Sequence, residues 1–269
     1  MKKKIVLLLA LVFVLGCNSE ELRLEPGTPD SHQNTTDDES NGGTDDDTDT
    51  TSDTDTTGNE TNTDLYNILS LGDSYTIGES VCSTCRFPEQ LKDSLAQRFE
   101  DSSWEVDVIA QTGWTTTNLI NAINAANLAT DYDLVTLLIG VNNQYQSLPF
   151  STYISEFPEL VETSIEAAQG DKSRVIVISI PDYAYTPFGQ GQGNAATISS
   201  EIDNYNSFAE SYCNQENISY VYITDITRQG LENTDLVASD GLHPSSLAYT
   251  KFVERLLPIA IEKLQLEHD

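Results

Sequence analysis

The stretch Tyr66-Asn67-Ile68-Leu69-Ser70-Leu71-Gly72-Asp73-Ser74-Tyr75-Thr76 decides the fold class. Its apolar first half predicts a strand over residues 66–71, and several of the chain's apolar runs are continuous rather than alternating, as in parallel strands covered on both faces. The serine that follows lies just past the carboxyl end of this strand, where open α/β sheets bind their ligands. Taken alone, Ser74 could equally be a helix cap, so its meaning depends on the rest of the chain.

Apolar runs alternate with stretches of helical period from residue 65 onward. Strands are predicted over residues 66–71, 104–110, 134–139, 174–180 and 220–223, and helices over residues 87–99, 116–129, 151–168, 196–217 and 245–266. Strict alternation of strand and helix predicts an α/β fold, a three-layer α/β/α sandwich around a five-stranded parallel sheet.

A glycine-rich segment, Gly189-Gln190-Gly191-Gln192-Gly193, follows the fourth predicted strand only after an irregular stretch. It lacks the tight strand–turn–helix context of a dinucleotide-binding fingerprint. We therefore expect a mobile loop there.

The first 17 residues have the pattern of an export signal. Lys2-Lys3-Lys4 precedes an apolar run over residues 5–15 that is too short to span a bilayer comfortably. The run ends in Val14-Leu15-Gly16-Cys17, which is similar to a bacterial lipobox, although Leu15 is bulkier than usual. We expect lipidation at Cys17 and an extracytoplasmic, membrane-anchored lipoprotein, periplasmic or on the cell surface; the alternative is an ordinary secretory signal.

Residues 18–64 are rich in Asp and Thr and almost free of large apolar side chains. Such a composition cannot bury enough apolar surface to offset chain entropy, and it predicts a disordered acidic tether. An EF-hand calcium loop starting at Asp45 is disfavoured, because its sixth and twelfth positions hold Thr50 and Thr56 instead of Gly and Glu. The remaining residues, 65–269, suit one domain.

Acidic residues outnumber basic ones in the chain, 43 to 13, with a formal net charge of −30. No basic patch is visible, which disfavours nucleic acid and electrostatic docking on anionic lipid as partners. The membrane is expected as a partner only through the lipid anchor. An acidic surface also slightly favours neutral substrates over anions.

His243 is the one histidine in a position that a catalyst could use. His32 lies in the acidic tract and His268 is the next-to-last residue. His243 occurs in Asp240-Gly241-Leu242-His243-Pro244-Ser245, so a single loop can carry an imidazole and a carboxylate that orients it. A serine nucleophile uses such a pair, which makes Ser74, Asp240 and His243 candidate catalytic residues. A lone histidine disfavours a metal-dependent deacetylase, and we expect neither metal nor cofactor.

Two further motifs follow the second and third predicted strands, Gln111-Thr112-Gly113-Trp114 and Gly140-Val141-Asn142-Asn143. The carboxyl ends of parallel strands share one edge of the sheet, so these motifs can converge with Ser74 and His243. The ordered set of Gly-Asp-Ser, Gly, Gly-x-Asn and Asp-x-x-His resembles the GDSL/SGNH hydrolase family across residues 65–269.

This resemblance implies a flavodoxin-like sandwich and a role for each matched residue. Ser74 would be the nucleophile, His243 the general base and then acid, and Asp240 the residue that orients the imidazole. The oxyanion hole would comprise the backbone N–H groups of Ser74 and Gly113 and the side-chain amide of Asn142. Asn143 departs from the family's usual Asn-Asp, which puts in doubt any structural role of that carboxylate.

Several neighbours of these motifs have two readings. Tyr75, Trp114 and Tyr145 could line a pocket for an acyl group or a sugar, or could belong to the core. Asp73 is expected to accept hydrogen bonds from backbone amides in its turn; the alternative is that it tunes the serine turn for catalysis.

Cys82-Ser83-Thr84-Cys85 can close a small disulfide ring outside the cytoplasm. A free dithiol and a thioredoxin-like redox pair are the alternatives. Cys213 is expected to be unpaired, on a buried helix face.

The residues together favour a serine ester hydrolase that works through an acyl-enzyme, on short acyl esters of glycans or small molecules. A lysophospholipase or thioesterase acting on longer chains is the second enzyme reading. A surface lipoprotein that only binds its ligand is the reading outside catalysis. A monomer is favoured.

Overall fold

The structure is a computed structural model that describes residues 64–266. The expected signal peptide (residues 1–17), the lipidation site Cys17 and the expected tether lie outside the described residues, apart from Asp64, which begins the first strand. His32 and His268 lie outside them too.

Five parallel strands form the sheet, in the order β2-β1-β3-β4-β5. Their bounds are Asp64–Gly72 (β1), Ser102–Ala110 (β2), Leu134–Leu138 (β3), Val175–Ile178 (β4) and Ser219–Val221 (β5). The central strands β3 and β4 are buried along their whole length, whereas exposure alternates along most of the edge strand β2. The predicted α/β/α sandwich is confirmed, and the order is the flavodoxin-like one.

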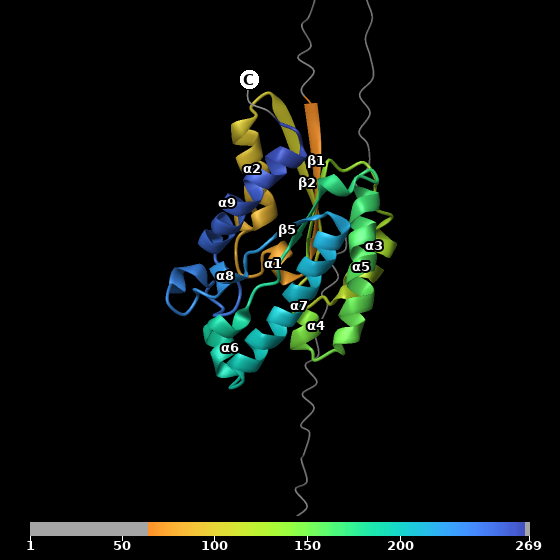
Figure 1. The fold of residues 1–269 in the computed structure, drawn as a ribbon. Helices are drawn as coiled ribbons and strands as arrows, with labels where there is room; N and C mark the ends of the chain where they lie inside the picture. The colour runs from red at the N-terminus through yellow and green to blue at the C-terminus, as the bar shows by residue number, and fades with distance from the viewer. Residues whose placement is uncertain (1–63, 267–269) are drawn as a thin grey trace, which may run out of the picture. The chain divides into compact units, whose positions relative to one another are not determined.

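Long helices cover both faces of the sheet (Figure 1). Helices α2 and α9 pack against each other on one face, and α3, α5 and α7 lie on the other. Their bounds are Phe87–Arg98 (α2), Thr116–Ala126 (α3), Phe150–Ala167 (α5), Ala195–Glu216 (α7) and Ser246–Lys263 (α9). These are the five helices that the sequence predicts, with ends that differ by at most three residues.

Strand register brings three loops to one edge of the sheet. Gly72 at the end of β1 pairs with Ala110 of β2 on one side and with Leu138 of β3 on the other. The chain therefore leaves all three strands at the same level. β1 is also where the direction of the strand order reverses, and open α/β sheets bind ligands at this switch point.

Short helices at this edge were not predicted from the sequence. They are α1 (Ser74–Ile77), α4 (Val141–Tyr145), α6 (Pro187–Gly191) and α8 (Thr224–Thr227). With four or five residues each, they are too short to show a helical period.

Helix α6 corrects the expectation of a mobile loop at residues 189–193. The Thr186 hydroxyl caps the helix by accepting from Gly189 N at 3.1 Å, and Pro187 occupies the first turn. Gly189 is buried, and a Cβ there would lie 1.9 Å from the carbonyl oxygen of Tyr183. A larger residue therefore does not fit at this position. Gly189 thus permits close packing of a short helix, whereas a Cβ at Gly191 or Gly193 would meet no atom within 4 Å.

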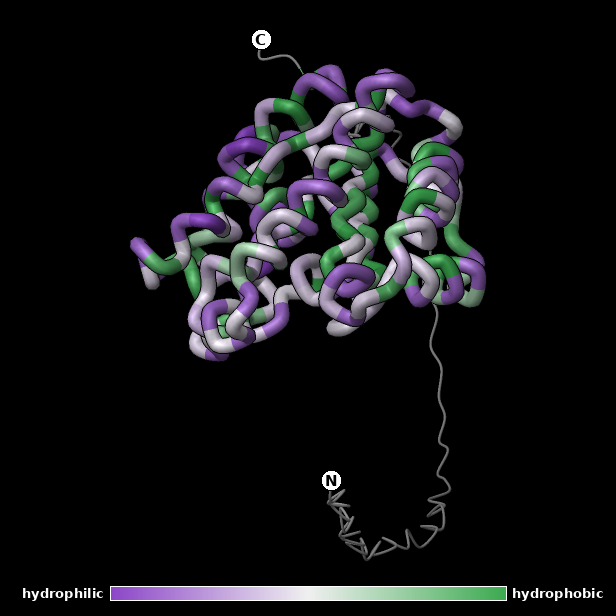
Figure 2. Tube along the Cα trace, turned by 60° about the horizontal axis from the view of Figure 1, so that its bottom comes forward, coloured by the Kyte–Doolittle hydropathy of each residue, from purple (hydrophilic) through white to green (hydrophobic). Residues whose placement is uncertain are grey.

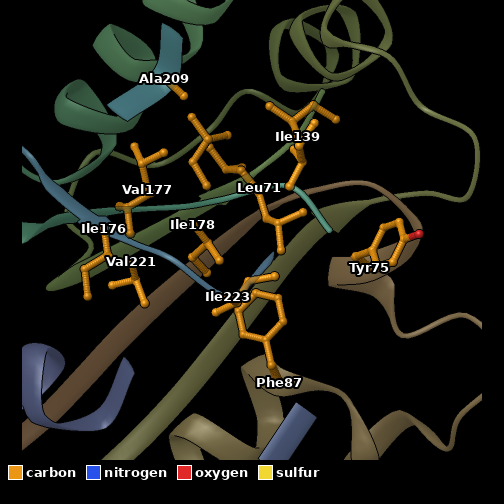
Figure 3. Close-up of a cluster of buried hydrophobic side chains, with 14 of the residues drawn as sticks. Leu71, Tyr75, Phe87, Ile139, Ile176, Val177, Ile178, Ala209, Val221 and Ile223 are labelled. Carbon is orange, nitrogen blue, oxygen red and sulfur yellow. The ribbon is translucent and has the colours of Figure 1, made fainter. Parts of the chain in front are cut away.

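The core lies between the sheet and its two helical layers. Hydrophobic positions gather in the interior of the domain and hydrophilic ones on its outer turns (Figure 2). Leu71, Ile178 and Ile223 pack with Phe87 of α2, and Tyr75 lies at one end of this cluster (Figure 3). The turn that carries Ser74 therefore rests directly on buried apolar side chains.

Cys82 and Cys85 are joined in a disulfide, the arrangement that the sequence favoured. Cys213 is free and buried on α7, also as expected. Within residues 64–266, no helix is both long and apolar enough to cross a membrane.

Candidate active site

Ser74 is the first residue of α1, immediately past the end of β1. Asp73 caps this helix, because its Oδ1 accepts a hydrogen bond from Tyr75 N at 3.0 Å, as the sequence analysis expected. Ser74 is only 3% exposed, and its hydroxyl makes no hydrogen bond to any described residue. The hydroxyl is thus available to a partner in the cavity that Ser74 lines.

Asp240 and His243 form one hydrogen-bonded unit within their loop. Nδ1 of His243 lies 2.6 Å from Oδ2 of Asp240. Oδ1 of the same carboxylate accepts from the backbone N–H groups of Leu242 at 2.9 Å and His243 at 3.0 Å. His243 is 7% exposed, and the ring of Tyr75 lies 5.3 Å from the imidazole, centre to centre. With Nδ1 held by Asp240, Nε2 is the nitrogen left for chemistry.

The Asp240 carboxylate remains ionised across the neutral range. Burial raises its pKa, but hydrogen bonds from His243, from Ser80 and from two backbone N–H groups outweigh burial. The pKa of Asp240 therefore lies well below its usual range. A negative charge therefore lies at Oδ2, 2.6 Å from Nδ1 of the imidazole.

Gly113 has a backbone conformation that suits glycine, with φ at +84°. A Cβ at this residue would meet no atom within 4 Å, so the need for glycine is conformational rather than steric. Its carbonyl accepts from Nε2 of Gln146 at 2.9 Å, whereas its N–H has no acceptor among the described residues. Gly113 thus has an uncommitted donor at the cavity wall.

Asn142 lies on α4, two residues after Gly140. Its Nδ2 donates to the Trp114 carbonyl at 3.0 Å, and the second contact of that nitrogen, with Oδ2 of Asp73, is long at 3.5 Å. One amide hydrogen is firmly held and the other only weakly. Asn142 therefore has a donor that a ligand in the cavity can attract.

Asp73 is fully buried below this donor. Burial raises the pKa of its carboxyl to about 7, although hydrogen bonds from Tyr75 N and from Asn142 act in the opposite direction. No cationic side chain hydrogen-bonds to Asp73 within the described residues.

Asn143 has a structural role that a carboxylate could not fill in the same way. It is fully buried, its Oδ1 accepts from Thr116 N at 3.0 Å, and its Nδ2 donates to the Thr116 hydroxyl at 2.6 Å. An amide can accept and donate at once, whereas an ionised aspartate only accepts. Asn143 thereby ties α4 to the first turn of α3.

One cavity of about 250 Å³ brings most of the predicted site residues together. Ser74, Gly113, Asn142 and His243 line it, and Asp240 stands behind His243. The opposite wall is aromatic, because Tyr145 contacts Tyr183 at 5.9 Å and Phe188 at 6.1 Å between ring centres. Val141 and Leu242 add further apolar lining.

Of the three expected pocket aromatics, Tyr75 and Tyr145 line this cavity and Trp114 does not. The Trp114 side chain packs against the hydrophobic core, and only its backbone carbonyl takes part in the site. The Trp114 side chain is partly buried against core residues and is therefore not available to the cavity.

Three contributors to the site were not predicted from the sequence. Tyr183 and Phe188 reach the cavity from segments after β4, where the sequence showed no motif. Ser80 donates to Oδ2 of Asp240 at 2.7 Å from 160 residues away. Only the nearness of Ser80 to Ser74 in the chain could have pointed to it.

No cluster of three or more His, Cys, Asp or Glu side chains among residues 64–266 could hold a metal ion. The chemistry available here is that of a hydroxyl, an imidazole, a carboxylate and amide donors.

Comparison with known proteins indicates one family for this chain. A sequence model described as GDSL-like Lipase/Acylhydrolase family matches residues 70–251. No curated protein sequence shows significant similarity to the chain.

Solved structures share the fold at low sequence identity. The psychrotrophic esterase EstA from Pseudoalteromonas sp. is 18% identical, with a TM-score of 0.54 over 75% of this chain and 99% of its own. An acetyl xylan esterase from Geobacillus stearothermophilus is 15% identical, with a TM-score of 0.55 over 78% and 99%. A lipase/acylhydrolase from Enterococcus faecalis is 20% identical, with a TM-score of 0.54 over 76% and 98%.

Proposed function

Because the chain belongs to the GDSL-like lipase/acylhydrolase family, we propose that it hydrolyses carboxylic esters through an acyl-enzyme formed on Ser74. The observation that carries the proposal is the shared cavity of Ser74, His243, Gly113 and Asn142, with Asp240 2.6 Å from the imidazole. A nucleophile, a base, an orienting acid and amide donors thus surround one small space.

In the first half-reaction, the Ser74 hydroxyl attacks the ester carbonyl and its proton passes to Nε2 of His243. Asp240 stabilises the imidazolium that forms. The C–O bond of the ester then breaks, and the alcohol leaves with the proton from His243. In the second half-reaction, a water molecule attacks the acyl-serine, His243 takes the water proton, and the acid is released as Ser74 regains its hydrogen.

The negative oxygen of each tetrahedral intermediate would accept hydrogen bonds from the N–H groups of Ser74 and Gly113 and from Nδ2 of Asn142. The free N–H of Gly113 and the loosely held second hydrogen of Asn142 support this role. Preorganised donors of this kind supply much of the rate acceleration in acyl transfer.

A short acyl group and a neutral alcohol suit the cavity best. Its volume of about 250 Å³ is small, and Tyr145, Tyr183 and Phe188 bound it on one side. The net charge of the whole chain, −30, disfavours anionic substrates. A fold shared with an acetyl xylan esterase is consistent with acetylated glycans or small acetyl esters as substrates.

We place the activity outside the cytoplasm. The three lysines and the apolar run that follows them support export, and Cys17 at the end of that run supports lipidation. Residues 18–64 would then separate the domain from the membrane. The enzyme would work as a monomer, without metal or cofactor.

A lysophospholipase or thioesterase is the second candidate, because the exposed Tyr145 could let a longer chain leave the cavity past its ring. The remaining alternative is a protein that only binds its ligand. The Ser74 hydroxyl argues against it, because that hydroxyl has no hydrogen-bond partner among the described residues and faces the cavity.

A fluorophosphonate probe and a series of p-nitrophenyl esters test the proposal together. We expect labelling of wild type at Ser74, none in Ser74→Ala, and a kcat/KM that falls by about tenfold or more from acetate to octanoate. A preference for octanoate would support the second candidate. Absence of both labelling and turnover would leave only the binding protein.

A further inference from the structure

The two oxygens of the Asp240 carboxylate are held in different ways. Oδ1 accepts from Leu242 N and His243 N, which belong to its own loop. Oδ2, the oxygen that contacts the imidazole, has one partner besides His243, the hydroxyl of Ser80 at 2.7 Å. Rotation of the carboxylate away from His243 is thus opposed at Oδ2 by a side chain from a distant part of the chain.

Ser80 reaches Asp240 from an unusual backbone conformation. Its φ is +67°, in the left-handed region that costs a non-glycine residue free energy. Ser80 is exposed, so core packing does not account for this conformation. Strained conformations of this kind persist where the surroundings impose them, often at functional sites.

The segment that imposes it, residues 78–85, is anchored to the nucleophile turn. Gly78 N and Glu79 N both donate to the carbonyl of Ser74, at 3.1 and 3.0 Å. At its other end the segment is closed by the Cys82–Cys85 disulfide. The direction of the Ser80 hydroxyl is therefore coupled to the backbone of Ser74.

The same segment also contacts the loop that carries Gly113, because the carboxylate of Glu79 accepts a hydrogen bond from the Thr112 hydroxyl. Residues 78–85 thus touch the nucleophile turn, the Gly113 loop and the Asp240–His243 loop.

We infer that Ser80 is a positioning residue for the proposed hydrolysis, which holds Oδ2 of Asp240 against His243. This inference rests on the proposed function. Ser80 touches neither substrate nor reacting atoms; its hydroxyl orients the carboxylate and shares its negative charge.

Ser80→Gly in the full chain is the decisive variant. Glycine adopts a φ of +67° freely, so the variant loses the hydroxyl and keeps the backbone. We expect kcat/KM for p-nitrophenyl acetate to fall about tenfold, mainly through kcat, as follows from losing a hydrogen bond to a charged group. Ser80→Ala should fall at least as far, because alanine also disfavours this φ. Ser83→Gly is the matched control, an exposed serine in the same segment, and should retain wild-type rates.

The pH profile separates positioning from a general loss of structure. Ser80→Gly changes both the charge density and the position of the carboxylate beside the imidazole, so the acid limb of the kcat/KM profile should move relative to wild type. Other titratable groups face this pair: burial holds the pKa of Tyr75 and of Tyr249 well above 10.0, and raises that of Asp73 to about 7. None of them hydrogen-bonds to Ser80 among the described residues, so comparing variant with wild type isolates the Ser80 effect. Proton NMR of the imidazole Nδ1–H provides a readout that needs no turnover, and its resonance should shift in Ser80→Gly.

Loss of rate together with both shifts supports the inference. Wild-type rates in Ser80→Gly overturn it, even if Ser80→Ala is impaired, because backbone conformation alone would then explain the defect. A lower rate with an unchanged acid limb and an unchanged resonance also overturns it. If wild type hydrolyses no ester while the resonance still shifts, the contact stands and the proposed function fails.

Discussion

The side-chain amide of Asn142 donates to the backbone carbonyl of Trp114 at 3.0 Å. This contact joins the loop after β2 to the helix after β3. It holds one amide hydrogen in place, so the other points away from the Trp114 carbonyl.

Asn142→Ala should therefore lower kcat on p-nitrophenyl acetate by ~10²–10³ with little change in KM, the usual effect of losing one oxyanion donor. Steady-state kinetics provide the measurement. Asn121→Ala, at an exposed position of α3, is the control. A kcat within threefold of wild type, ~0.7 kcal/mol by the usual conversion, would remove Asn142 from the oxyanion hole.

Tyr145 should contribute to substrate selection rather than to chemistry. Tyr145 is 50% exposed at the aromatic wall of the cavity. Tyr145→Ala should therefore raise KM for p-nitrophenyl acetate several-fold and leave kcat nearly unchanged, because about 1 kcal/mol of contact with the substrate is lost. The variant should also tolerate octanoate better, because the cavity opens. Tyr222→Ala, at an exposed tyrosine outside the cavity, should change neither value. A fall in kcat alone would contradict this assignment.

Asp73 should make the stability of the domain depend on pH. Because burial raises its folded pKa to about 7, above the unfolded value, the folded state holds a proton that the unfolded state releases between about pH 4 and pH 7. Wild type should lose stability as pH rises through this window, on the order of 2 kcal/mol between pH 5 and pH 8 relative to Asp73→Asn. Urea unfolding at both values measures the difference. Asp93→Asn, at an exposed carboxylate, is the control, and parallel behaviour of wild type and Asp73→Asn would refute the prediction.

Two arginines should differ sharply in their effect on stability. Arg228 Nε lies 2.9 Å from Oδ2 of Asp182, which is completely buried. Arg228→Met leaves that carboxylate without a counter-ion among residues 64–266 and should cost about 3–5 kcal/mol of unfolding free energy. Arg255 pairs with Asp225 at a half-exposed site, so Arg255→Met should cost about 1 kcal/mol or less. Equal losses in urea unfolding would show that burial of Asp182 does not set the difference.

The sequence by itself determined the sheet and its edge. The runs that became β3 and β4 are apolar apart from Thr136 and predicted strands covered on both sides, and their alternation with helical stretches predicted a parallel sheet. Parallel strands end at one edge, so Ser74, Gly113 and Asn142 could be assigned to the same side. The Asp240–His243 pair was equally accessible, because three residues of one loop bring the carboxylate to the imidazole.

Tertiary structure alone decided how these groups are oriented and what surrounds them. Phe188 reaches the cavity because α6 docks on the Asp240–His243 loop, where Phe188 N donates to the Gly241 carbonyl at 2.9 Å. Ser80 meets Asp240 across 160 residues through a left-handed turn. Hydrophobic period reports which face of an element is buried, and local spacing reports hydrogen bonds within a turn. Neither reports the path of a loop, because that path depends on contacts with segments far away in the chain.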